Sequence, residues 1–218
     1  MNIKEKQAHE TNFSKGRQSK IKYIVIHYTA NNGDTAEGNC NYFFKENRNA
    51  SAHYFVDENE IWQSVKDNNV AWHCGANSYK HKTCRNSNSI GIEMCSRIIN
   101  GKYIIDLKTV SNAIELTKFL MKKYNISVDN ILRHYDVTGK NCPRPFVENE
   151  NLWLNFKARL EDEMVSNIKI KLNGRLKTVE AINKNGFNYI KIRDLEDDKI
   201  KISYDNVEKI PTIEINNY

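Results

Sequence analysis

Residues 21–29 read Ile-Lys-Tyr-Ile-Val-Ile-His-Tyr-Thr, and this stretch decides the fold. Most of its side chains are apolar and many are β-branched, which is the pattern of a short strand covered on both faces. We therefore predict a central strand with His27 at its carboxyl end. A lone histidine at the end of a strand is more often a packed polar residue than a ligand, so a role for His27 depends on partners elsewhere in the chain.

Strands and helices alternate after this stretch. A turn at 31–34 leads into a helix that is expected from Thr35 to Arg48, and an amphipathic stripe predicts another helix from Lys108 to Tyr124. Further strands are expected at 52–56, 60–65, 89–95 and 131–134, and a third helix at 149–163. This alternation predicts an α/β fold.

The composition changes after the third helix. Residues 168–172 alternate with period two and lead into an Asn173-Gly174 turn, which is typical of a hairpin. More short strands are expected at 178–182, 189–192, 199–204 and 212–215. We therefore predict two domains, an α/β domain over 1–165 and a small β-rich C-terminal module over 166–218.

Composition and charge restrict the class of protein. The chain is 39% apolar and 28% charged, and no run approaches the roughly 18 apolar residues of a membrane-spanning helix, so no integral membrane association is expected. Its first residues are polar and lack the core of a secretory signal, which predicts synthesis in a cytoplasm without Sec export. A net charge of +6 favours an acidic partner. The lysines are scattered among acidic residues, which argues against nucleic acid.

Two further candidate ligands, His134 and Cys142, lie close together in the run 133–143. Two imidazoles and one thiolate can hold a zinc ion and leave its fourth position open, as in catalytic rather than structural sites. We therefore predict one Zn²⁺ ion bound by His27, His134 and Cys142. Its bound water, with a pKa lowered to about 7, would attack an amide or an ester. The other cysteines are expected to be reduced rather than paired in disulfides.

Hydrolysis also needs a proton shuttle and a group that stabilises the developing oxyanion. Glu93 interrupts an apolar strand, where a carboxylate is costly to bury without a partner such as a metal-bound water. The alternative is a salt-bridged or edge-exposed glutamate. Lys140 lies two residues before Cys142 and would reach the tetrahedral oxygen, the alternative being an ordinary solvated lysine. Glu93 and Lys140 are our candidate catalytic residues.

A long connection, residues 66–88, separates two of the expected strands. Connections of this length are uncommon inside compact domains unless they line a binding site. Trp72 and His73 precede Gly75 in this loop, and an aromatic ring and an imidazole there would line a groove for a sugar or a peptide. An alternative is a second, structural zinc site made of His73, Cys74, His81 and Cys84. The adjacent histidine and cysteine lack the spacing of common zinc fingers, which counts against it.

Five motifs occur in order between residues 20 and 160. They are residues 23–29, 51–56, 71–75, 88–93 and 133–143. Together they resemble the zinc-dependent N-acetylmuramoyl-L-alanine amidase family of type 2, whose fold is shared with peptidoglycan recognition proteins. The resemblance implies a central mixed β-sheet flanked by helices. It also implies that His27, His134 and Cys142 bind zinc.

By the same resemblance, Glu93 assists the attacking water and Lys140 stabilises the intermediate. Some family members carry aspartate at the third ligand position, and some use tyrosine in place of Glu93. The sequence leaves open whether His53 or Tyr54 matches that tyrosine, and neither is given a catalytic role. Trp72 and His73 match a segment near the family's substrate groove and are expected to bind substrate.

The function implied by the resemblance is peptidoglycan hydrolysis. Zinc-activated water would cleave the amide between N-acetylmuramic acid and L-alanine of the stem peptide, degrading the bacterial cell wall and causing lysis. The alternative is a peptidoglycan-binding protein on the same fold without catalysis, in which the third ligand is typically missing. The expected source is a clostridial phage or prophage endolysin that reaches the wall by holin-type release or non-classical export.

The C-terminal module weakly resembles small β-rich repeats of clostridial wall hydrolases, through residues 188–195 and 202–205. That resemblance implies retention on the cell wall. A solubilising or dimerising appendage is the alternative.

Overall fold

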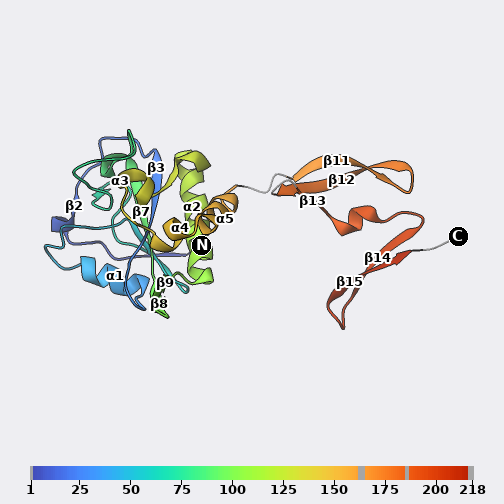
Figure 1. The fold of residues 1–218 in the computed structure, drawn as a ribbon, viewed down its shortest axis with the longest axis horizontal. Coiled ribbons are helices and arrows are strands. Elements are labelled where there is room, and N and C mark those ends of the chain that lie inside the picture. Colours follow the sequence, from blue (N-terminus) through green and yellow to red (C-terminus); the bar gives the residue numbers. More distant parts are fainter. Residues whose placement is uncertain (1, 162–164, 185–186, 216–218) are drawn as a thin grey trace. The chain divides into compact units, whose positions relative to one another are not determined.

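The structure is a computed structural model that describes residues 2–161, 165–184 and 187–215. It divides into two compact units, Met1–Glu161 (the first unit) and Asp162–Tyr218 (the second unit), and each is described by itself (Figure 1). The sequence placed the division a few residues later, after residue 165. None of the helices in the described ranges combines the length and the apolar character needed to cross a membrane.

A six-stranded mixed sheet forms the centre of the first unit. The strand order is β1-β5-β4-β7-β3-β10. The strands are β1 (Ile3–Glu5), β3 (Tyr23–Tyr28), β4 (Tyr54–Val56), β5 (Ile61–Gln63), β7 (Ser89–Met94) and β10 (Ile131–Arg133). The β4–β5 pair is antiparallel, and the other pairs are parallel. The predicted mixed α/β sheet is confirmed.

The apolar stretch of residues 21–29 contains β3, which lies between β7 and β10. Ile24, Val25 and Ile26 have no solvent-exposed surface, as expected for a strand covered on both faces. Successive side chains of a strand point to opposite faces. Ile24 and Ile26 therefore join the core on one face, and Val25 packs against a separate buried cluster on the other face.

Helices cover both faces of the sheet (Figure 1). The long helix α2 (Leu107–Tyr124) packs Leu116 and Leu120 into the main core, together with α5 (Glu150–Ala158). On the other face lie α1 (Ala36–Phe43) and the short helix α3 (His134–Thr138). The remaining helix, α4 (Arg144–Glu148), precedes α5.

The first helix is shorter than the sequence predicted. Thr35 caps it, because its side chain accepts a hydrogen bond from the Gly38 amide at 3.0 Å. The helix ends at Phe43 rather than Arg48. Asn47 and Asn49 both adopt left-handed backbone conformations, with φ of 55° and 52°, and these are incompatible with a continuing helix. The predicted third helix is also shorter, since α5 ends at Ala158.

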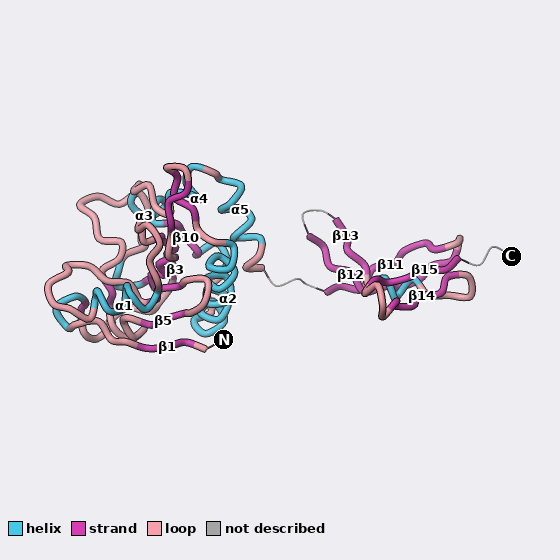
Figure 2. Tube along the Cα trace, turned by 90° about the horizontal axis from the view of Figure 1, so that it is seen from below, coloured by secondary structure: helices cyan, strands magenta, loops and turns pink. Residues whose placement is uncertain are grey.

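The segment between β5 and β7 consists largely of loops and turns, which also make up much of the first unit (Figure 2). Its one strand, β6 (Val70–Ala71), pairs with β2 (Phe13–Ser14). A hairpin of β8 (Arg97–Ile99) and β9 (Lys102–Ile104) follows β7, and the sequence had not indicated it.

The described part of the second unit contains antiparallel strands and one short 3-10 helix, η4 (Ile192–Leu195). One sheet contains β11 (Val165–Leu172), β12 (Arg175–Lys184) and β13 (Phe187–Ile190), and a two-stranded sheet contains β14 (Ile200–Asp205) and β15 (Ile210–Ile215). The expected Asn173-Gly174 turn is confirmed, with φ of 48° and 82° at its two residues. These positive values suit the tight turn between two paired strands.

Gly91 is the position in the sheet where a side chain is least tolerable. A Cβ atom there would lie 2.5 Å from Cγ of His73, which is far inside van der Waals contact. We expect Gly91→Ala to lower the free energy of unfolding by about 1–3 kcal/mol, because the buried ring must move. Gly75→Ala is the control, since its Cβ would meet only the Asn86 amide at 3.5 Å. It should change stability by no more than about 0.5 kcal/mol.

Denaturant titration followed by tryptophan fluorescence measures this difference. All three tryptophans, Trp62, Trp72 and Trp153, belong to the first unit, so the signal reports that unit alone. Equal stabilities for the two alanine variants would contradict the predicted collision.

Candidate metal centre

The centre lies where three neighbouring parallel strands end. In the register of β3 and β7, His27 stands opposite Glu93. Ile26 and Ile92 point into the α2 core, so His27 and Glu93 point to the opposite face. On the other side of β3, strand β10 ends at Arg133 and helix α3 begins at His134. The parallel sheet thus brings residues from three distant segments to one edge.

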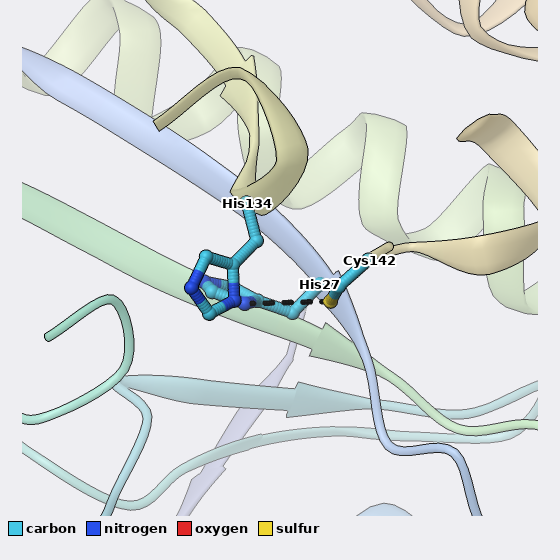
Figure 3. A group of neighbouring side chains, drawn as sticks. All are labelled: His27, His134 and Cys142. Carbon is cyan, nitrogen blue, oxygen red and sulfur yellow. Dashed lines mark hydrogen bonds between the residues drawn. The ribbon is translucent and has the colours of Figure 1, made fainter. Parts of the chain in front are cut away.

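His27, His134 and Cys142 converge on one point (Figure 3). Their potential ligand atoms all lie within 4.8 Å of one another, and all three side chains are buried. The Sγ atom of Cys142 is 3.8 Å from Nδ1 of His27, and the two imidazole rings are 4.7 Å apart between centroids. Within the described ranges, this is the one group of three or more histidine, cysteine or acidic side chains with such spacing.

The electrostatics of this cluster suit a bound cation. Burial lowers the pKa of His27 well below its ordinary value and that of His134 to about 4, so both rings are neutral and can donate a lone pair. Nδ1 of His134 is buried without a hydrogen-bond partner. Burial raises the pKa of the Cys142 thiol to about 12, and only a nearby cation would favour its thiolate. Two nitrogens and one sulfur fit a borderline-soft divalent metal.

Glu93 borders the cluster. Its Oε1 atom is 3.9 Å from Nδ1 of His27, and its Oε2 atom is buried with no hydrogen-bond partner. Burial raises the pKa of this carboxyl group to about 8, against the opposing charge of Lys140. Strand β7 lies between β4 and β3, so the alternative of an edge-exposed glutamate is wrong.

Lys140 follows α3 and is exposed. Gly139 ends that helix in a left-handed conformation, with φ of 85°, and turns the chain toward Cys142. The carbonyl of Cys142 accepts a hydrogen bond from the Tyr135 amide at 2.9 Å, which ties the returning loop to α3. Lys140 therefore lies on the short loop that connects two of the three converging residues.

Two cavities adjoin the centre. One, of about 650 Å³, is lined by Trp72, His73, His134, Lys140 and several asparagines. The other, of about 490 Å³, has Glu93 in its wall. Their lining is mixed polar and aromatic, which suits a ligand with many hydrogen-bonding groups.

Tyr54 does not belong to this centre. The alternative zinc site of His73, Cys74, His81 and Cys84 is not formed either. Tyr54 packs in the α2 core, where its hydroxyl donates to Asp67 at 2.7 Å. Cys74 and Cys84 are buried beside Val25 and Val137. Across the described part of the chain no second metal-binding group occurs, so the structural zinc site is not formed. None of the five cysteines is paired in a disulfide.

Sequence reasoning missed Arg133, which holds the start of α3. Its buried guanidinium group donates to Asp136 at 3.0 Å, to Glu150 at 2.6 Å and to the Phe146 carbonyl at 3.0 Å. These contacts connect the end of β10 to α4 and α5. The only signal in the sequence was its position directly before His134.

The chain has recognisable relatives. The family model for N-acetylmuramoyl-L-alanine amidase, Amidase_2, matches residues 17–145. A probable N-acetylmuramoyl-L-alanine amidase from Bacillus licheniformis is 38% identical over 149 residues, which cover 65% of this chain and 41% of the relative. The match thus spans about two fifths of the length of this relative and of two similar Bacillus amidases.

Solved structures are similar to about three quarters of the chain. The catalytic domain of XlyA has a TM-score of 0.62 at 32% identity, covering 74% of this chain and 100% of that chain. PlyL has a TM-score of 0.64 at 28% identity, covering 76% of this chain and 100% of that chain.

Arg133→Ala should destabilise the first unit by about 2–4 kcal/mol, because it leaves the partly buried Asp136 carboxylate and the Phe146 carbonyl without their donor. The matched control is Arg144→Ala, which removes an exposed pair with Glu148 at 2.6 Å and should cost less than about 1 kcal/mol. Far-ultraviolet circular dichroism is the appropriate probe, since Arg133 lies over the Trp153 ring and would disturb its fluorescence directly. Losses of equal size would show that Arg133 acts only as a surface charge.

Proposed function

The chain belongs to the N-acetylmuramoyl-L-alanine amidase family, and on that premise we propose that it hydrolyses the amide between N-acetylmuramic acid and L-alanine in bacterial peptidoglycan. The observation that carries the proposal is the buried convergence of His27, His134 and Cys142 beside Glu93. A peptidoglycan-binding protein without catalysis has no need for three buried ligands next to an unpartnered carboxylate. The enzyme is therefore the better candidate.

The proposed cofactor is one Zn²⁺ ion held by His27, His134 and Cys142. When bound with three protein ligands, zinc supplies a Lewis acid that makes water nucleophilic near neutral pH and polarises a carbonyl group. The protein contributes neutral imidazoles and a thiol that is buried beside them.

Glu93 is the proposed proton carrier. It stands next to His27 and lines a cavity, so its free oxygen can accept a proton from the attacking water. It would then give that proton to the amine of L-alanine as the C–N bond breaks. A carboxyl group whose pKa is raised by burial is suited to both transfers near neutral pH.

Lys140 is the proposed stabiliser of the oxyanion. Lys140 lines the larger cavity, as does His134. A fixed positive charge near the scissile carbonyl stabilises the charge that develops in the transition state more than it stabilises the substrate. Trp72 lines the same cavity and is proposed to contact the glycan or the peptide arm.

We propose that the C-terminal module, residues 166–218, helps to retain the protein on the cell wall. Several large apolar side chains of the second unit are exposed, among them Leu176, Tyr189 and Val207. Contiguous exposed apolar side chains mark surfaces that bind a partner, and these residues are the candidates for such a surface.

Digestion of purified peptidoglycan tests the proposed activity. We expect mass spectrometry to find stem peptides with new L-alanine amino termini and glycan strands with free lactyl carboxyl groups. A zinc chelator should abolish their release, and added Zn²⁺ should restore it. New reducing sugar ends would instead indicate a glycosidase. Binding to the wall without any cleavage would favour the receptor alternative.

Two substitutions should separate metal binding from proton transfer. Cys142→Ser should lower zinc affinity and turnover together, because it replaces a strong zinc ligand with a hydroxyl group. Glu93→Gln should keep one zinc ion per chain and lower kcat by about 10²- to 10⁴-fold. The matched control is Cys40→Ser, which changes an equally buried cysteine in α1 and should keep its zinc. Normal turnover in either Cys142→Ser or Glu93→Gln would refute the assigned role.

A further inference from the structure

His73 is buried between His27 and the first residue of β7, Ser89. Its Nδ1 atom is 3.0 Å from Nε2 of His27, and its Nε2 atom is 3.1 Å from Oγ of Ser89. The rings of His73 and His27 are perpendicular, with centroids 5.1 Å apart. Both nitrogens of His73 therefore serve contacts within the protein, which leaves none of them for a substrate.

The contact between Ser89 and the Arg85 carbonyl determines which atom donates in each of these hydrogen bonds. The Ser89 hydroxyl lies 2.7 Å from the carbonyl oxygen of Arg85, which can only accept. A hydroxyl group has one hydrogen, so Ser89 donates to Arg85 and must accept from His73. The Cys74 sulfur, at 4.0 Å from the same hydroxyl, is a much weaker competitor.

When both imidazoles are neutral, each has one donor nitrogen and one acceptor nitrogen, so the Ser89 contact sets the tautomer of each ring. His73 carries its proton on Nε2, and its Nδ1 atom accepts. His27 therefore carries its proton on Nε2, and its Nδ1 atom keeps a free lone pair. That lone pair belongs to the nitrogen that lies 3.8 Å from the Cys142 sulfur and 3.9 Å from Glu93. A metal ligand needs a free lone pair on the atom that faces the ion.

We propose that His73 is a positioning residue, which holds His27 in the Nε2–H tautomer and in the ring orientation that presents Nδ1 to the metal. We call the series Arg85 carbonyl, Ser89, His73 and His27 the hydrogen-bond chain. The proposal rests on the proposed zinc site for its functional consequence. It replaces the direct substrate contact that the sequence had suggested for His73.

The surroundings of His73 leave its ring little freedom. Gly91 packs against it so closely that no Cβ atom fits between them. On another side lies the ring of His53, with centroids 5.6 Å apart, and Nδ1 of His53 accepts from the Gly91 amide at 3.0 Å. The backbone amides of His73 and Cys74 both donate to Oδ1 of Asn86, at 3.2 and 2.8 Å. The loop thus holds the His73 ring in a fixed position against Nε2 of His27.

The residues on one face of β7 all contact His73 or His27. Ser89, Gly91 and Glu93 alternate with the core residues Ile90 and Ile92 and so share the face on which His27 lies. Ser89 is a member of the hydrogen-bond chain, Gly91 makes room for His73, and Glu93 adjoins the metal cluster. A single strand therefore supplies both the support of His27 and the proposed proton carrier.

The tautomers can be measured without any metal. Two-bond ¹H–¹⁵N correlation spectra of the full chain with chelator present, near neutral pH, distinguish Nδ1–H from Nε2–H in each histidine. We expect the Nε2–H form for both His27 and His73. An Nδ1–H tautomer at either residue would overturn the proposal.

Zinc affinity, measured by competition with a chromophoric chelator, tests the consequence. His73→Ala should weaken zinc binding by about 10- to 100-fold, as losses of groups that orient metal ligands typically do. His73→Asn should restore most of the affinity, because the amide oxygen of asparagine can accept where Nδ1 does. Ser89→Ala should weaken binding as well, since His73 is then free to adopt either tautomer.

The control is Thr83→Ala, in the same loop but outside the hydrogen-bond chain, where its hydroxyl pairs with Tyr23. It should bind zinc like the unchanged protein. Unchanged affinity in both His73→Ala and Ser89→Ala would refute the role of His73 while leaving the zinc site intact. A protein that binds no zinc even without substitution would refute the proposed function itself. The asparagine and Ser89 variants keep the test decisive if His73→Ala does not fold.

Discussion

The parallel register of β3 and β7 is the constraint on which the rest of the centre depends. It sets His27 opposite Glu93 and, two residues earlier, Val25 opposite Gly91. A slip of one residue would turn every side chain of a strand to the other face. Such a slip would place isoleucines at the cluster and charges in the core, so the burial of Ile24, Ile26, Ile90 and Ile92 fixes the site as firmly as it fixes the fold.

Burying several polar groups at one edge of the sheet costs desolvation free energy. Some of these groups have hydrogen-bond partners in the structure, and others do not. Hydrogen bonds satisfy His73 through both nitrogens, and His53 receives the Gly91 amide. By contrast, Nδ1 of His134 and Oε2 of Glu93 are buried without partners. Buried polar atoms normally have partners, and each exception calls for an explanation. Unpartnered atoms also occur in Gln7, Ser64 and Thr109, whereas these two belong to the candidate metal cluster and its neighbour Glu93. The satisfied groups therefore surround and support the unsatisfied ones, where a cation and a water molecule would complete the bonding.

Much of the fold and of the metal centre could be predicted from the sequence, but only where residue type or hydrophobic periodicity gave a signal. The β-branched run predicted β3, the apolar stripe predicted α2, and chemistry singled out His27, His134 and Cys142. The contact between His73 and His27 was not predictable, because it depends on the path of residues 66–88, which have no periodicity. The early end of α1 was missed for a related reason, since asparagine tolerates left-handed conformations without requiring them.

Charge is divided unequally between the two units, and this bears on how the protein would engage a cell wall. In residues 162–218 the basic and acidic side chains balance, so the whole net charge of +6 belongs to the first unit. Long-range attraction to an anionic wall would then act on the unit that carries the metal centre. If the second unit retains the protein there, it must do so through short-range contacts of its exposed apolar and aromatic side chains rather than through net charge. Salt would therefore weaken the approach of the first unit to the wall more than the hold of the second.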